Sequence, residues 1–172
     1  IIRHYRFISA IAGETIPPEP PRINWRDRAP PVPEGAPYVV LNPGSNEPGR
    51  RWPMAGYLSL ARTLTERGFR VVFVGRAEER PDQDDTGEAI QEIGDKDSII
   101  DLTGKTGLPE LLDLMKQAVL VVSNDTGPAH LSIALDRPTV VIVGGGHFGS
   151  FVPYPKEVTP ETARFVFQEM EC

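Results

Sequence analysis

The chain has 172 residues, of which 40% are hydrophobic and 24% charged, and its formal net charge is −6. These values suit one globular domain with a full core, and the acidic balance argues against a nucleic-acid partner, which would require clustered Lys and Arg. No apolar run is long enough to span a bilayer and no signal peptide is visible, while the one cysteine, Cys172, excludes an internal disulfide and fits a reducing, cytoplasmic compartment.

Residues 1–36 are expected to precede the main domain. The chain does not begin with Met, and its first twelve residues have the apolar spacing of a helix end. The stretch that follows is crowded with proline, which lacks a backbone donor and fixes φ, so it should form an extended linker. We interpret residues 1–36 as the end of an interdomain helix and a linker, and residues 37–172 as a nucleotide-binding domain whose partner domain lies upstream.

From Tyr38 onward, short apolar strands alternate with helices. The pattern predicts strands at 38–41, 70–74, 98–102, 119–122 and 139–143, and helices at 55–67, 86–93, 109–117 and 128–135. Such alternation is typical of a parallel, doubly wound sheet, whose strands are rich in Val and Ile because both faces are covered. The predicted fold class is therefore α/β, with a mostly parallel, Rossmann-like sheet.

A small or polar residue follows the end of each predicted strand. In an open α/β sheet, ligands bind outside the carboxyl ends of the strands. The residues that we expect to converge on this one edge are Ser45, Asn46, Gly75, Thr106, Asp125 and the glycines from Gly144 onward.

The most informative segment runs from Asn124 to His130 and reads Asn-Asp-Thr-Gly-Pro-Ala-His. It places turn residues between a buried strand and a helix predicted to begin at Pro128, with Asp125 or Thr126 as the helix N-cap. The free N–H groups at such a helix start attract anions, phosphate above all. Because helical side chains lean toward the N-terminus, His130 could reach the same anion.

Each functional assignment has a plainer alternative. Asp125 could be a helix cap without a ligand contact, Arg50 a solvated surface charge, and His130 a purely structural histidine. The spacing Gly144-x-Gly146-x-x-Gly149 also matches a dinucleotide-binding fingerprint. That fingerprint requires a helix to open at its third glycine, which the prolines that follow would prevent, so we expect no such cofactor.

Three motifs together resemble the heptosyltransferase-like glycosyltransferases of family 9. They are Pro43-Gly44-Ser45, Arg50-Arg51-Trp52-Pro53 and the segment from Asn124 to His130, and the similarity extends from about Tyr38 to Tyr154. The resemblance implies a GT-B architecture, in which two Rossmann-like domains face each other across a cleft. The C-terminal domain holds the nucleotide-sugar donor and the N-terminal domain holds the acceptor. The sequence from Gly146 to Pro155 differs from that of the lipopolysaccharide heptosyltransferases, which leaves the sugar open.

The resemblance also implies the roles of individual residues. Those at donor and phosphate positions are Ser45, Asn46, Arg50, Asp125, Thr126, Gly127 and His130, and those at nucleoside positions are Glu78, Glu79 and Thr106. The catalytic base of the family lies in the N-terminal domain, so none is expected in this chain.

The implied function is that of the donor-binding half of an inverting glycosyltransferase. It would transfer heptose or a similar sugar from a nucleoside-diphosphate sugar to a lipopolysaccharide-type, other glycan or lipid-linked acceptor, and the full-length protein could associate peripherally with the membrane. The chain alone should be inactive. A non-catalytic, Rossmann-type nucleotide-binding module is the alternative.

The chemistry of this reaction does not call for a metal ion. Backbone N–H groups, a helix dipole and an arginine can stabilise a departing diphosphate. Asp82, Asp84 and Asp85 come closest to an Asp-x-Asp metal motif, but they lie in an acidic stretch that we interpret as a solvated face. We therefore expect neither a metal nor another cofactor.

Overall fold

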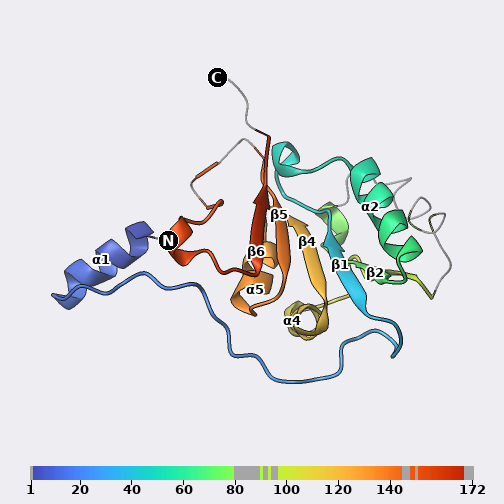
Figure 1. Cartoon of the computed structure of the whole chain (residues 1–172), viewed down its shortest axis with the longest axis horizontal. Coiled ribbons are helices and arrows are strands. Elements are labelled where there is room, and N and C mark those ends of the chain that lie inside the picture. Colours follow the sequence, from blue (N-terminus) through green and yellow to red (C-terminus); the bar gives the residue numbers. More distant parts are fainter. Residues whose placement is uncertain are drawn as a thin grey trace.

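The computed structural model describes residues 2–79, 90, 93, 97–144, 148–149 and 151–168. Its centre is a six-stranded sheet with the order β3-β2-β1-β4-β5-β6, in which every neighbouring pair is parallel (Figure 1). The strands are β1 (Tyr38–Asn42), β2 (Arg70–Phe73), β3 (Ile99–Asp101), β4 (Leu120–Asn124), β5 (Thr139–Ile142) and β6 (Ala163–Val166). The predicted α/β fold with a parallel sheet is confirmed.

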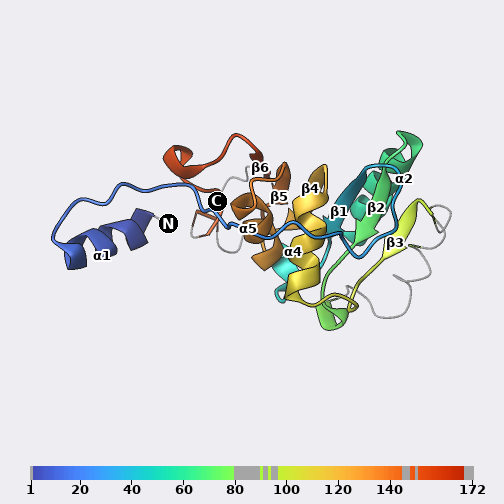
Figure 2. The ribbon, with the colours of Figure 1, turned by 90° about the horizontal axis from the view of Figure 1, so that it is seen from below.

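Helices cover both faces of this sheet, as Figures 1 and 2 show. They are α2 (Met54–Glu66) on one face, and α4 (Leu108–Gln117) and α5 (Gly127–Ala134) on the other. Alternate residues of β1 pack on opposite faces of the sheet, because successive side chains of a strand point in opposite directions. Val39 and Leu41 pack with Tyr57 of α2, whereas Val40 packs with Leu114 of α4. The sheet is therefore a buried middle layer, and its ends are left for binding.

The predicted elements differ from the observed ones mainly at their ends. Most boundaries shift by one or two residues, and α5 begins at Gly127 rather than at Pro128. Strand β6 was not predicted. It has four residues, lies at the edge of the sheet beside β5 and follows a proline-containing segment. Its sequence therefore lacks the continuous apolar run that is typical of an internal strand.

Residues 13–37 contain no helix or strand and run along the outside of the domain, past α4 and α5 (Figure 2). The absence of helix and strand agrees with the prediction for this stretch, which is held against the domain, and its role as an interdomain linker remains a prediction. The indole N–H of Trp25 donates to Asp113 Oδ1 at 2.7 Å, and Arg26 Nη2 lies 3.2 Å from Asp113 Oδ2. The helix before it, α1 (Ile2–Ala12), lies apart from the sheet (Figure 1). The domain boundary at 36/37 remains a prediction.

Several positions named from the sequence fall outside the described residues. They are Asp82, Asp84, Asp85, Gly146, Cys172 and most of the expected helix at 86–93, of which Ile90 and Ile93 are described and contribute to the core. Within the described part of the chain, no helix is both long enough and apolar enough to cross a membrane.

Candidate functional site

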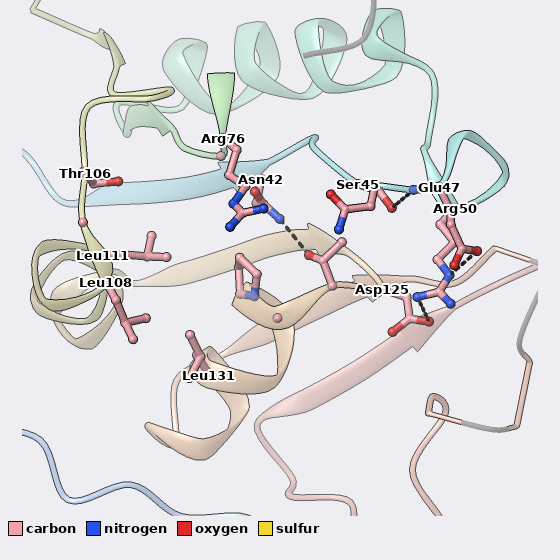
Figure 3. Close-up of a pocket in the computed structure, with 16 residues that line it drawn as sticks. Asn42, Ser45, Glu47, Arg50, Arg76, Thr106, Leu108, Leu111, Asp125 and Leu131 are labelled. Carbon is pink, nitrogen blue, oxygen red and sulfur yellow. Dashed lines mark hydrogen bonds and ion pairs between the residues drawn. The ribbon is translucent and has the colours of Figure 1, made fainter. Parts of the chain in front are cut away.

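A cavity of about 590 Å³ lies where β1, β2 and β4 end and where α4 and α5 begin (Figure 3). Its lining comes from four separate segments of the chain: Asn42, Ser45, Asn46, Glu47, Arg50, Gly75, Arg76, Thr106, Gly107, Leu108, Leu111, Asp125, Thr126, Gly127, Pro128 and Leu131. The predicted convergence of Ser45, Asn46, Gly75, Thr106 and Asp125 on one edge of the sheet is confirmed.

The two ends of this cavity differ in chemistry. Figure 3 shows Ser45, Arg50 and Asp125 at one end, with Leu108 and Leu111 at the other. The cavity is therefore charged at the start of α5 and apolar at the start of α4. Such a shape suits an elongated ligand that carries an anionic group at one end and a flat apolar group at the other.

The turn between β4 and α5 leaves the start of the helix open. Thr126 is the N-cap of α5, with an extended backbone (φ −147°, ψ 173°), but its side chain makes no capping hydrogen bond. Thr126 Oγ1 instead accepts a hydrogen bond from Asn42 Nδ2 at 3.0 Å. A Cβ added to Gly127 would meet no atom within 4 Å, so the first turn faces open space. Asp125 does not cap the helix, and the interpretation of Asp125 as only a cap is wrong.

Asp125 lies between the side chains of Arg50 and His130. Its side chain is 5% exposed, with Oδ2 at 4.0 Å from Arg50 Nη1 and Oδ1 at 3.6 Å from His130 Nε2. Arg50 Nε also lies 3.1 Å from Glu47 Oε2. The Arg50 side chain is 17% exposed, so the interpretation of Arg50 as a solvated surface charge is wrong. The charged end of the cavity thus contains one guanidinium held between two carboxylates.

The loop that carries Arg50 is fixed by the buried side chain of Asn124. Its Oδ1 accepts the N–H of Trp52 at 3.0 Å, and its Nδ2 donates to the carbonyl of Pro43 at 2.7 Å. The Tyr57 hydroxyl donates to Asn124 Oδ1 at 3.1 Å. One amide therefore ties both ends of the loop between β1 and α2 to the end of β4. This arrangement explains why two motifs 70 or more residues apart line one cavity.

A close approach at Gly144 holds the same loop from the other side. A Cβ added to Gly144 would lie 2.6 Å from the carbonyl oxygen of Gly49 and 2.9 Å from Arg50 Cα. The second residue after β5 must therefore be glycine for the turn at Pro48–Arg50 to keep its position. This contact gives Gly144 a role in placing Arg50, separate from any dinucleotide fingerprint.

His130 lies at the side of the cavity and does not line it. Its Nδ1 is hydrogen-bonded to the hydroxyl of Tyr154, and the two rings are stacked with centroids 5.6 Å apart. Burial, and secondarily the nearby carboxylate of Asp125, raise the pKa of Tyr154 to about 12. His130 therefore contacts the cavity through Asp125, and a direct contact with a bound anion remains a prediction.

The two candidate nucleoside-binding carboxylates lie on the short 3₁₀ turn Ala77–Glu79 that follows β2. Glu78 lines a smaller cavity of about 380 Å³ with Asn46, Arg51 and Arg76. Glu79 lines neither this cavity nor the larger one. Thr106 does line the larger cavity, beside its apolar end. The roles of all three residues toward a nucleoside remain predictions.

Sequence reasoning missed Asn42, Arg76 and Tyr154. Asn42 is 1% exposed and ends a fully buried strand, so an amide at that position was a signal that could have been used. Arg76 directly follows Gly75 at the end of β2 and could have been found in the same way. Tyr154 had no local signal, because its partner His130 lies 24 residues earlier in the chain.

No group of three or more His, Cys, Asp and Glu residues that could hold a metal ion occurs among the described residues. Arg50, the amide of Asn42 and the start of α5 are instead the groups that border the cavity near Asp125. They can orient an anion, and independence from metal remains a prediction.

Comparison with known proteins places this geometry in a family. Residues 19–163 match the family described as glycosyltransferase family 9 (heptosyltransferase). Lipooligosaccharide heptosyltransferase 2 of Haemophilus influenzae is 33% identical over 109 residues, which are 63% of this chain and 31% of that protein. Lipopolysaccharide heptosyltransferase 2 of Escherichia coli K12 is 31% identical over 111 residues, again 63% and 31%. The chain spans about a third of the length of these relatives.

Solved structures show the same fold. The E. coli ADP-heptose lipopolysaccharide heptosyltransferase II is similar with a TM-score of 0.62 and 29% identity, over 76% of this chain and 38% of that one. A family 9 glycosyltransferase from Veillonella parvula is similar with a TM-score of 0.62, over 95% of this chain and 39% of that one. At 21% identity, that second likeness shows the fold alone. The family match covers most of the chain, and the three motifs noted in the sequence meet at one edge of the sheet. The chain therefore belongs to glycosyltransferase family 9.

Proposed function

We propose that this chain is the donor-binding half of an inverting glycosyltransferase that uses a nucleoside-diphosphate sugar. The observation that carries the proposal is the cavity at the carboxyl edge of the sheet, charged beside the start of α5 and apolar beside the start of α4. A nucleoside diphosphate has the same two parts in the same order, an anionic diphosphate and a flat base joined by a ribose.

The diphosphate would bind at the charged end. The N–H groups of the first turn of α5 and the positive end of its dipole favour an anion there, and Arg50 adds a full positive charge. Ser45 Oγ accepts the N–H of Glu47 at 3.2 Å, which leaves the hydroxyl proton to donate to a phosphate oxygen. Asn46 lines the same part of the cavity. Asp125 would face the sugar side, because a carboxylate repels phosphate but accepts sugar hydroxyls.

The base would bind at the apolar end. Leu108, Leu111 and Leu131 give it three aliphatic contacts, and Thr106 offers a hydroxyl at its edge. The E. coli relative at 29% identity is an ADP-heptose heptosyltransferase, and another E. coli heptosyltransferase, at 25% identity and a TM-score of 0.50, has been solved with ADP. We therefore propose adenine as the base and heptose as the sugar.

Transfer would proceed by displacement at the anomeric carbon. An acceptor hydroxyl forms the new glycosidic bond while the bond to the β-phosphate oxygen breaks, so negative charge grows on the departing diphosphate. Arg50 and the N–H groups of α5 would stabilise that charge without a metal ion. The acceptor proton would pass to a base outside this chain. A lipopolysaccharide-type acceptor, and peripheral attachment of the whole protein to the cytoplasmic side of a membrane, belong to the same proposal.

The test is calorimetry of the protein with ADP, GDP, UDP, dTDP and ADP-heptose. ADP and ADP-heptose should bind, and more tightly than the other nucleotides. Arg50→Ala should weaken the binding of ADP about tenfold or more, because a charge-assisted hydrogen bond contributes about 1.5–3 kcal/mol to the binding free energy. Arg62→Ala, which removes an exposed arginine of α2, is the matched control. Absence of nucleotide binding, or equal ADP affinity in both variants, would contradict the proposal.

A further inference from the structure

Tyr154, His130 and Asp125 form a continuous line of contacts that ends at the wall of the main cavity. The hydroxyl of Tyr154 is hydrogen-bonded to His130 Nδ1, and His130 Nε2 lies 3.6 Å from Asp125 Oδ1. Asp125 lines the cavity, whereas the other two residues do not. The line therefore connects a buried phenol outside the site to a carboxylate inside it.

The neighbours of the two ring nitrogens select one tautomer of His130. Nε2 faces a carboxylate oxygen, which can only accept a hydrogen bond, so the proton belongs on Nε2. In the neutral ring Nδ1 is then a lone-pair acceptor, and the hydroxyl of Tyr154 is its donor. The raised pKa of Tyr154, about 12, keeps that hydroxyl protonated at neutral pH. Both contacts thus require the same distribution of protons.

Tyr154 is itself firmly held. It is 7% exposed and belongs to a core cluster with Ala129 and Ile133, which are residues of α5. Its ring also stacks on the imidazole with an interplanar angle of 16°. The tyrosine therefore restricts the rotation of the imidazole about its bond to Cβ as well as its protonation.

We propose that Tyr154 is a positioning residue for the donor site, which fixes His130 in the tautomer that carries its proton on Nε2 and so holds the Asp125 carboxylate in place. Asp125 is then restrained on both oxygens, by His130 on Oδ1 and by Arg50 on Oδ2. The same arrangement directs the Nε2 proton of His130 at Asp125, which lines the charged end of the cavity. The link to the donor rests on the proposed function, whereas the tautomer does not.

The tautomer is measured by long-range ¹H–¹⁵N spectra of the protein labelled in its histidines, at pH 8 and without nucleotide. His130→Gln assigns the resonance. We expect an unprotonated, hydrogen-bonded Nδ1 and a protonated Nε2 in the unaltered protein. Tyr154→Phe keeps the ring stack but removes the donor, and should shift the signals toward a mixture of tautomers. Tyr38→Phe is the matched control, since it removes another buried tyrosine hydroxyl, bonded to the carbonyl of Leu114 at 2.7 Å.

Calorimetry with ADP-heptose supplies the second readout. Tyr154→Phe should weaken binding about three- to tenfold, the usual effect of one lost hydrogen bond, while Tyr38→Phe should bind as the unaltered protein does. A proton on Nδ1 in the unaltered protein, unchanged His130 signals in Tyr154→Phe, or equal affinity in the two phenylalanine variants would overturn the inference. If ADP-heptose binds none of the proteins although the tautomer is as expected, the proposed function fails and the hold of Tyr154 on His130 stands.

Discussion

Gly144→Ala is the substitution that separates the position of Arg50 from its charge. The added Cβ would lie 2.6 Å from the carbonyl oxygen of Gly49 and 2.9 Å from Arg50 Cα. Both neighbours are backbone atoms, so neither can rotate away. The turn must withdraw by about 0.8 Å for the first contact to reach the 3.4 Å at which ordinary packing begins. Gly144 has no positive φ, so the effect of the variant is steric and not conformational.

Displacement of the turn moves the guanidinium away from Asp125 and from the start of α5. A misplacement of about 1 Å can cost up to about 100-fold where geometry is critical, and we expect ADP to bind about tenfold more weakly. Crowding of the loop should also cost about 1–3 kcal/mol of stability. Calorimetry and thermal melts measure the two effects. Gly49→Ala is the control, because its Cβ would meet no atom within 4 Å in the same turn. ADP affinity equal to that of the control would refute this account of Gly144.

Three further predictions concern the linker contact, the polar network and metal dependence. Asp113→Asn should lower the melting temperature at pH 7, because hydrogen bonds from Arg26 and Trp25 lower the pKa of Asp113 against the opposing effect of burial. A lowered folded-state pKa stabilises the fold above the unfolded value of about 3.9, and this stabilisation is lost as pH falls through the folded value. The difference in melting temperature between the two proteins should therefore shrink in acid. Asn42→Ala should weaken ADP binding about three- to tenfold, as judged by calorimetry, because Thr126 loses its hydrogen bond at 3.0 Å. Chelator should leave ADP affinity unchanged, and a loss that magnesium restores would contradict the role given to Arg50.

The architecture could be predicted because its signals are local. The buried strands are continuous apolar runs, and strand–helix alternation leaves few topologies open. The site could be predicted for the same reason, since parallel strands bring their carboxyl ends to one edge. Asp125 and Ser45 therefore meet although they are 80 residues apart in the chain.

What could not be predicted depends on contacts without a local pattern. Tyr154 reaches His130 from an irregular segment, and nothing in the spacing of either residue indicates the other. The bond from Trp25 to Asp113 spans 88 residues and begins in a proline-rich stretch that has the composition of a free linker. Thr126 was correctly placed as a possible cap, but the competing bond from Asn42 decides where its hydroxyl points.

The fastening of the linker has a mechanical consequence. Lys116 lies 2.7 Å from Asp27, so α4 receives an ion pair from the linker in addition to the bonds at Asp113. The opposite end of α4 carries Leu108 and Leu111, which form the apolar wall of the cavity. Arg70 of β2 also donates hydrogen bonds to the carbonyls of Pro33 and Ala36, so a pull along residues 13–37 is transmitted both to this helix and to the sheet. The linker and the apolar end of the cavity are thus joined through α4, which contacts the one with its C-terminal half and lines the other with its first turns.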